Sequence, residues 1–317
     1  MEKFRISFSD MENLIRMNHF PDDLSKLRTS CPEWFFVGIR GAVPSNSEAW
    51  KSFSSSIELT LKPVDYIHYN CAIIQVNKSK LSPFMATTLP GKQYVDIVSI
   101  DSPLNPKGAA RLLQGRHIVR QGYHKASDPG KRYPAFTQHG TFPLLRDTNK
   151  NLKFDWNDAD TLSFTKSSGI NIHYGTGTNI GLWSAGCQVI NTDTGLKKWN
   201  EFRTRIYTGA PEISKNYPYY LFNADYVAEF VRTPKSKIHG KQRLLWGSCG
   251  SYVREVQIEL KELGYDVGTV DGIYGPKTIT KGVIPFKVIN FELGNTDPIV
   301  DIAMWNHLFS DNAVPNV

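Results

Sequence analysis

A histidine and a cysteine, His173 and Cys187, flank a glycine-rich stretch within residues 169–190. The thiolate is the attacking form of cysteine, and a neighbouring imidazole both lowers the thiol pKa and carries a proton to the leaving amine. The stretch is typical of a strand, a loop and a second strand, so we expect a hairpin that places His173 beside Cys187. The backbone amides of Gly186 and Cys187 are the expected donors to an oxyanion. The pattern predicts acyl transfer through a cysteine nucleophile.

The same stretch resembles the L,D-transpeptidase catalytic domain family. The family signature is His-Gly-Thr, a loop containing Ile/Leu-Gly, and Ser-x-Gly-Cys followed by apolar residues. This chain carries, in that order, His173-Tyr174-Gly175-Thr176, Ile180-Gly181 and Ser184-Ala185-Gly186-Cys187. The resemblance covers residues 130–195, and the segments 84–91 and 122–125 upstream are candidate substrate-facing loops.

The resemblance implies a mainly β domain whose cysteine takes an acyl group from the L,D bond of a peptidoglycan stem peptide and passes it to an amine or to water. It implies Cys187 as the nucleophile and His173 as the base. Ser184 and Gly186 are the matching loop elements. The chain departs from the family at Tyr174, which is inserted after the histidine, and at Ala185 and Val189, where the family often has His and Arg.

Further residues near this motif are candidates for substrate binding. Arg146 could supply the cation that Val189 has displaced, and Trp183 and Tyr174 could line a cleft. His139 is a rival base because it too begins a His-Gly-Thr triplet. The choice between His173 and His139 stays open at this point.

The elements around the motif are mainly short β-type runs between residues 30 and 235, such as 34–39, 72–76 and 94–98, separated by turn residues. Apolar residues at helical spacing in 11–17 predict one helix before them, with Asp10 as the N-cap. The fold class is therefore α+β, with a mainly β domain over residues 1–231. Residues 232–244, which are basic and contain proline and glycine, predict a linker.

Residues 245–317 are expected to form a second, helical domain. Val253, Val256, Leu260 and Leu263 fall on one helix face, and Gly264 is positioned to end that helix. Residues 251–308 resemble the peptidoglycan-binding domain family, a three-helix module with an Asp-Gly-x-Tyr/Phe-Gly turn, here 271–275, and a closing Trp-x-x-Leu, here 305–308. In that turn, Tyr274 is either a packed aromatic residue or a contact to sugar or peptide.

The composition excludes several other classes. The formal net charge of +7 suits an anionic partner, but no basic run or zinc-finger spacing points to nucleic acid. The cysteines Cys31, Cys71, Cys187 and Cys249 form no CxxC pair, and the histidines form no HExxH, so we expect no metal and no cofactor. The sequence contains no apolar stretch long enough to predict a membrane-spanning helix, so we expect no membrane insertion.

Together these features predict a peptidoglycan-active cysteine enzyme that cleaves stem-peptide bonds in the manner of an endolysin. The partner is bacterial peptidoglycan, and a monomer is expected. Because the first residues lack a signal-peptide pattern, we expect synthesis in the cytoplasm and action at the wall after release or delivery. The alternatives are an L,D-transpeptidase with an amine acceptor, a non-catalytic wall-binding protein, or an enzyme that cuts glycan strands.

Overall fold

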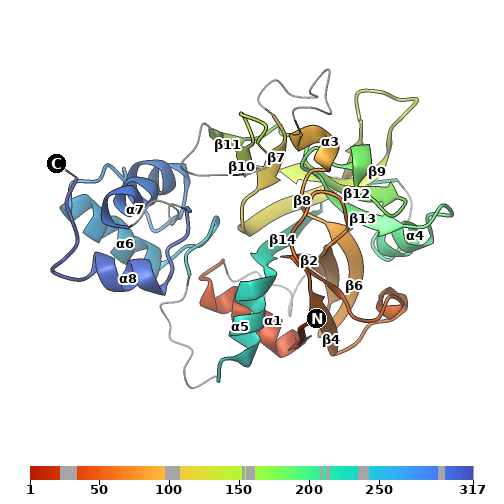
Figure 1. Ribbon diagram of the computed structural model, residues 1–317, viewed down its shortest axis with the longest axis horizontal. Coiled ribbons are helices and arrows are strands. Elements are labelled where there is room, and N and C mark those ends of the chain that lie inside the picture. Colours follow the sequence, from red (N-terminus) through yellow and green to blue (C-terminus); the bar gives the residue numbers. More distant parts are fainter. Residues whose placement is uncertain are drawn as a thin grey trace.

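A closed β-barrel lies at the centre of the larger part of the molecule (Figure 1). The structure is a computed structural model that describes residues 1–21, 34–96, 108–151, 154, 161–207, 210–211, 215–234, 243–291 and 297–316. In barrel order the strands are β12 (Asn171–Thr176), β13 (Gln188–Thr192), β6 (Lys80–Thr87), β5 (Cys71–Asn77), β2 (Trp34–Arg40), β14 (Asn216–Asn223), β8 (Gly115–His124) and β9 (Tyr133–His139). Strand β9 then pairs with β12 and closes the barrel.

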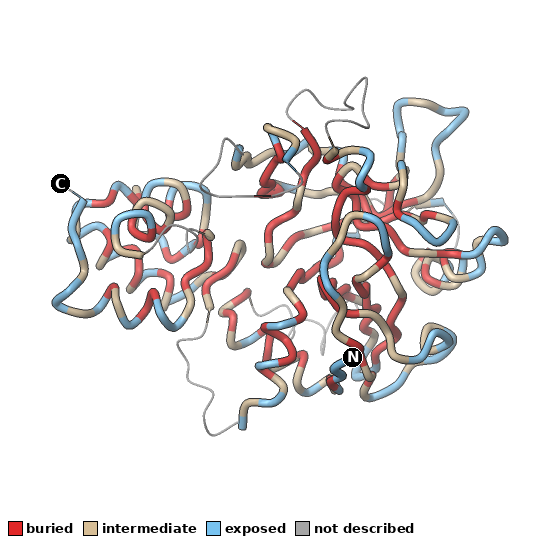
Figure 2. The backbone as a smooth tube through the Cα atoms, in the orientation of Figure 1, coloured by how far each residue is buried: buried red, intermediate tan, exposed pale blue. Residues whose placement is uncertain are grey.

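The barrel interior is filled by aromatic side chains. Phe36 of β2 packs on Phe136 of β9 with ring centroids 4.8 Å apart, and on Phe202 of the helix α4 (Lys197–Thr204) at 5.4 Å. Along β8 buried and partly exposed residues alternate, as expected when one face of a strand points into a barrel. Buried residues accordingly follow the barrel strands in Figure 2. The predicted strands 34–39 and 72–76 are confirmed as β2 and β5.

Two small sheets and several helices lie against the barrel. One sheet has the order β1 (Lys3–Ser7), β4 (Ser56–Leu61), β3 (Ala42–Pro44), and the other β11 (Thr161–Thr165), β10 (Phe142–Arg146), β7 (Ala110–Leu112). The helices α1 (Phe8–Met17) and α5 (Ala224–Arg232) bury apolar faces against β2 and β5, which explains why those strands are buried on both faces. Short helices also occur at η1 (Ala49–Lys51), α3 (Lys92–Val95) and η3 (Gly181–Trp183).

Two local predictions were wrong. The helix α1 is capped by Ser7, whose Oγ accepts from the Asp10 N–H while the Asp10 carboxylate accepts from the Ser7 N–H. Asp10 is therefore at position N3 of a capping box and is not the N-cap. The run 94–98 was expected to be a strand, but its start belongs to the helix α3 and residues 97–98 lie outside the described chain.

The C-terminal region is helical, as predicted. Its elements are α6 (Ser251–Glu262), the π-helix η5 (Thr278–Val283), α7 (Ile284–Asn290) and α8 (Ile302–Leu308), shown in blue in Figure 1. Val253, Val256 and Leu260 of α6 are buried together with Trp305 of α8 in one core. Gly264, with φ at +87°, follows the last turn of α6, which fits its expected role in ending the helix.

The helical module is joined to the barrel side by backbone contacts. The Arg116 N–H of β8 donates to the Trp246 carbonyl, and the Cys249 N–H donates to the His19 carbonyl. The helix α5 runs into the predicted linker 232–244, and residues 235–242 of that linker lie outside the described chain. None of the described helices is both long enough and apolar enough to span a membrane.

Candidate active site

The thiol and the imidazole of the predicted pair lie on one outer face of the barrel. Strands β12 and β13 pair in parallel, with His173 opposite Val189, so the expected hairpin is wrong. Cys187 precedes Val189 by two residues, and alternate residues of a strand share a face. The parallel register therefore brings Cys187 to the same side as His173, although by a different topology from the one expected.

The loop before β13 holds Cys187 in place through Ser184 and Gly186. The Ser184 hydroxyl donates to the Cys187 carbonyl at 2.8 Å and accepts from the Gly186 N–H at 3.2 Å. Gly186 has φ at +141°, and a Cβ at this position would lie 2.6 Å from the Ala110 carbonyl oxygen of β7. Only glycine fits this close approach. Because the Gly186 N–H already has a partner in Ser184, it does not serve as the free oxyanion donor that we expected.

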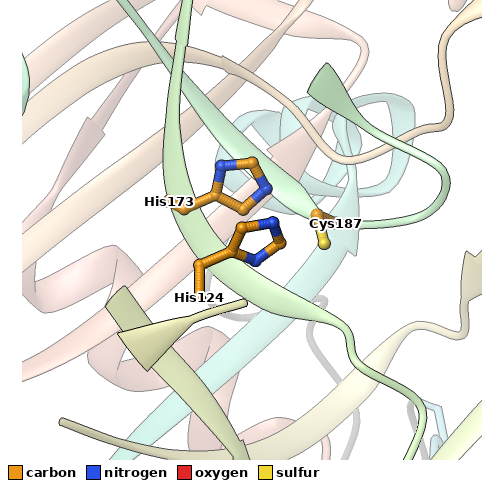
Figure 3. Close-up of side chains that lie close together, drawn as sticks. All are labelled: His124, His173 and Cys187. Atoms are coloured by element: carbon orange, nitrogen blue, oxygen red, sulfur yellow. The ribbon is translucent and has the colours of Figure 1, made fainter. Parts of the chain in front are cut away.

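A second imidazole joins the pair. One ring nitrogen each of His124 and His173 and the sulfur of Cys187 lie within 4.8 Å of one another. The two rings are stacked with centroids 4.1 Å apart, and both face the thiol (Figure 3). His124, at the end of β8, was not predicted as a site residue. The only signal was the segment 122–125, which we named as a candidate substrate-facing loop.

Hydrogen bonds fix the form of His173. Its Nδ1 lies 2.8 Å from the Tyr174 carbonyl oxygen and 3.1 Å from the Tyr133 hydroxyl. A carbonyl oxygen can only accept, so Nδ1 carries the proton. The other nitrogen, Nε2, is therefore unprotonated and has a free lone pair. It is buried and has no hydrogen-bond partner among the described residues. This nitrogen is in the right state to take a proton from the thiol.

Burial keeps both groups neutral when no ligand is bound. It raises the pKa of the Cys187 thiol to about 11, against a smaller opposite effect of the Asn171 backbone N–H. Burial, together with a smaller effect of the nearby His124, lowers the pKa of His173 to about 3. Burial also lowers the pKa of His124 to about 4. In this state the Cys187 Sγ donates a long hydrogen bond of 3.5 Å to the Gly169 carbonyl.

The thiol opens into a cavity of about 330 Å³. Cys187 is 8% exposed, and His173 lies behind it at 1%. The described lining includes two cations, Lys125 and Arg146, and no carboxylate. The remaining lining residues are Tyr94, Gly108, Ala109, Ala110, His124, Ser168, Gly169, Ile170, Leu182, Trp183, Ala185 and Gly186. A cavity of this size and charge suits a small ligand with an anionic group.

Two predicted substrate-binding residues thus line the cavity, Arg146 and Trp183. Tyr174 lies outside the lining and packs on Tyr133 and Trp183 at ring separations of 4.6 and 5.5 Å. It packs against the cavity-lining Trp183 and does not itself line the cavity.

The other two predicted residues do not belong to the site. His139 pairs with Ile118 on β8, and the register puts it four residues beyond the position on β9 that faces His173, about 13 Å along the strand. It is absent from the imidazole and thiol cluster of the described chain, so His139 is not the base. Tyr274 is 1% exposed in the core of the helical module and donates to the Pro298 carbonyl, so its role is packing and not ligand contact.

Comparisons with known proteins identify the helical module. Residues 249–281 match the putative peptidoglycan binding domain family, in agreement with the C-terminal domain expected from the sequence. The match covers α6, the turn with Tyr274 and the start of η5. Searches of curated proteins and of solved structures returned no match to this chain. The C-terminal region therefore associates the chain with the bacterial cell wall.

Proposed function

Since residues 249–281 match a peptidoglycan-binding family and a thiol lines a cavity beside a buried imidazole, we propose that this chain is a cysteine peptidase acting on peptidoglycan. The helical module holds the chain on the wall while Cys187 attacks a carbonyl of a stem peptide. The observation that carries the proposal is the Nε2 of His173, which lies in the same cluster as the thiol and is buried, unprotonated and without a hydrogen-bond partner among the described residues.

The reaction runs from the neutral pair. When the substrate carbonyl reaches Cys187, the His173 Nε2 takes the thiol proton as the sulfur–carbon bond forms. The carbon–nitrogen bond of the substrate then breaks, and His173 returns its proton to the leaving amine. Water, deprotonated by the same Nε2, attacks the thioester, and the thiol leaves with the proton. The Tyr174 carbonyl holds the Nδ1 proton throughout and stabilises the imidazolium formed midway.

The cavity favours a substrate with a carboxylate. Lys125 and Arg146 both line it, and stem peptides carry free carboxylates that such cations bind. Arg146 is nearly buried and its Nη1 donates to the Gly108 carbonyl, which fixes the guanidinium at the cavity wall. Trp183 and Tyr94 add aromatic walls for the peptide backbone.

The acceptor decides between two activities of the same site. Water gives a lytic hydrolase of the endolysin type, which is our first choice, and an amine gives an L,D-transpeptidase. Both use Cys187 and His173 in the same roles, so only the products separate them.

A second candidate function is wall binding without catalysis. The state of Cys187 favours this function. Burial raises the pKa of its thiol to about 11, and the thiol donates to the Gly169 carbonyl. The site without a ligand therefore holds a neutral thiol and not the nucleophilic thiolate.

Purified muropeptides incubated with the protein and analysed by mass spectrometry test the proposal. We expect new fragments from the wild type and from Cys249→Ala, which removes a thiol of the helical module, and none from Cys187→Ala. His173→Gln is expected to slow the reaction by about 10²- to 10⁴-fold. Added D-amino acid reports an amine acceptor if it is incorporated. Identical products from the wild type and Cys187→Ala, with pelleting on wall sacculi retained, would leave only the binding function.

A further inference from the structure

His124, His173 and Cys187 have the chemistry of a metal site as well as that of a catalytic site. They come from three segments, the end of β8, β12 and the residue before β13, and their ligand atoms converge within 4.8 Å (Figure 3). No other trio of His, Cys, Asp or Glu in the described part of the chain comes this close. The sequence could not indicate this group, because the two histidines are far apart along the chain.

One buried nitrogen of this cluster, the His173 Nε2, makes no hydrogen bond to the described residues. A buried polar atom left unsatisfied costs about 1–3 kcal/mol. A metal ion between the three side chains would satisfy this nitrogen directly.

The far nitrogen of His173 is held as it is in metal sites, and that of His124 is held in the same way once the Asn171 amide, whose nitrogen faces it, is turned. The His173 Nδ1 donates to the Tyr174 carbonyl at 2.8 Å, and the His124 Nδ1 lies 3.0 Å from the Asn171 side-chain amide. Rotation of that amide by half a turn presents its oxygen to an Nδ1–H of His124. Such outer contacts orient metal-binding imidazoles and leave Nε2 for the ion.

We propose that His124, His173 and Cys187 bind one Zn²⁺ ion. Two imidazoles and a thiolate are a ligand set that zinc prefers, and tetrahedral zinc needs ligand atoms about 3.3–3.6 Å apart, a modest contraction of the cluster. Cys187 and His124 both line the cavity, so a water or ligand in the cavity would be the fourth ligand of the ion. The charge of Lys125 acts on both imidazoles, but Lys125 is exposed, so solvent weakens its repulsion of a bound cation. This proposal departs from the expectation of no metal that was drawn from the sequence.

Zinc binding masks the nucleophile. Cys187 releases its thiol proton to solvent and forms a sulfur–zinc bond, with no change in oxidation state. The same sulfur and the same Nε2 then cannot serve acyl transfer. Reversible inhibition by zinc rests on the proposed function, but zinc binding itself does not.

Cobalt and thiol alkylation test the site without an activity assay. Co²⁺ added to the chelator-treated full chain is expected to give a thiolate-to-cobalt charge-transfer band at one equivalent, lost in Cys187→Ser. Zn²⁺ is expected to slow alkylation of Cys187 at least tenfold while leaving Cys249 unaffected. His124→Ala is expected to weaken zinc binding at least tenfold in titration calorimetry, and His139→Ala, a histidine outside the cluster, to leave it unchanged.

Each result decides the metal proposal separately from the peptidase proposal. No charge-transfer band, or no protection of Cys187 in the wild type, overturns the zinc site even if His124→Ala fails to fold. Equal zinc affinity in His124→Ala and the wild type overturns the role of His124. If zinc binds but the metal-free protein cuts no muropeptide, the zinc site stands and the peptidase fails.

Discussion

Without a substrate, we expect Cys187 to behave as an unactivated thiol. Its pKa is raised from 9.0 to about 11 because it is buried. The thiolate is the species that reacts, and its fraction falls tenfold for each unit between the pH and a higher pKa. A thiol with pKa near 9 is about 3% ionised at pH 7.5, and one near 11 about 0.03%. Cys187 is therefore expected to carry roughly 100-fold less thiolate than an unperturbed cysteine.

The assay is the pH dependence of iodoacetamide alkylation in metal-free protein, followed by mass spectrometry of the Cys187 peptide, with a short cysteine peptide as the reference. We expect the Cys187 rate to rise about tenfold per pH unit from 7 to 10 without a plateau. His173→Gln is expected to change this rate less than threefold, because an imidazole with a pKa of about 3 is neutral and does not stabilise the thiolate. A plateau below pH 8, abolished by His173→Gln, would show a preformed thiolate–imidazolium pair and refute this account.

Three further predictions follow from the same region. His117 and His173 are buried with pKa values of about 3, below 6.5 for the unfolded chain, so the unfolded state binds more protons. The contribution of these histidines to the free energy of unfolding is therefore fully present above pH 6.5 and is lost as the pH falls towards 3. Below pH 6.5 the loss is about 1.4 kcal/mol per pH unit for each histidine, which urea unfolding at a series of pH values measures. Gly186→Ala is expected to destabilise the fold in thermal melts more than Gly177→Ala, where φ is +86° but no atom lies within 4 Å, so only the backbone penalty of about 1–2 kcal/mol applies. Lys125→Gln is expected to raise KM for a carboxylate-bearing muropeptide about tenfold with kcat little changed, and a larger fall in kcat would argue for a role in the chemical step.

The pairing of His173 and Cys187 could be predicted because both lie in one glycine-rich segment with few ways to fold. The direction of pairing could not, since parallel and antiparallel strands share the same alternation of side chains. Residues 177–187, with the short helix η3, form the connection that returns the chain to run in parallel. Such a choice depends on the neighbours of β12 and β13 in the barrel.

His124 could not be found from sequence for a similar reason. Its place beside His173 depends on the registers of β8 with β9 and of β9 with β12, two long-range pairings. A shift of one residue in either would turn His124 away from the site. In the helical module the family pattern located Tyr274 but not its environment, because an aromatic side chain in a turn can point into the core or outward. Here Tyr274 is buried in the core.

The neutral state of the pair has a physical cause that bears on how the site is controlled. A thiolate and an imidazolium formed here would both have to give up solvation, and their attraction offsets that loss only in good hydrogen-bonding geometry. The Cys187 thiol donates to the Gly169 carbonyl at 3.5 Å, and the Nε2 of His173 accepts no hydrogen bond from the described residues, so the pair lacks this geometry. In the proposed reaction a bound substrate supplies what is missing, because the sulfur electron pair forms the bond to the carbonyl carbon and the negative charge moves to the carbonyl oxygen while the thiol proton moves to Nε2. If the chain is the peptidase that we propose, proton transfer is coupled to bond formation, and the thiol stays neutral until a substrate fills the cavity.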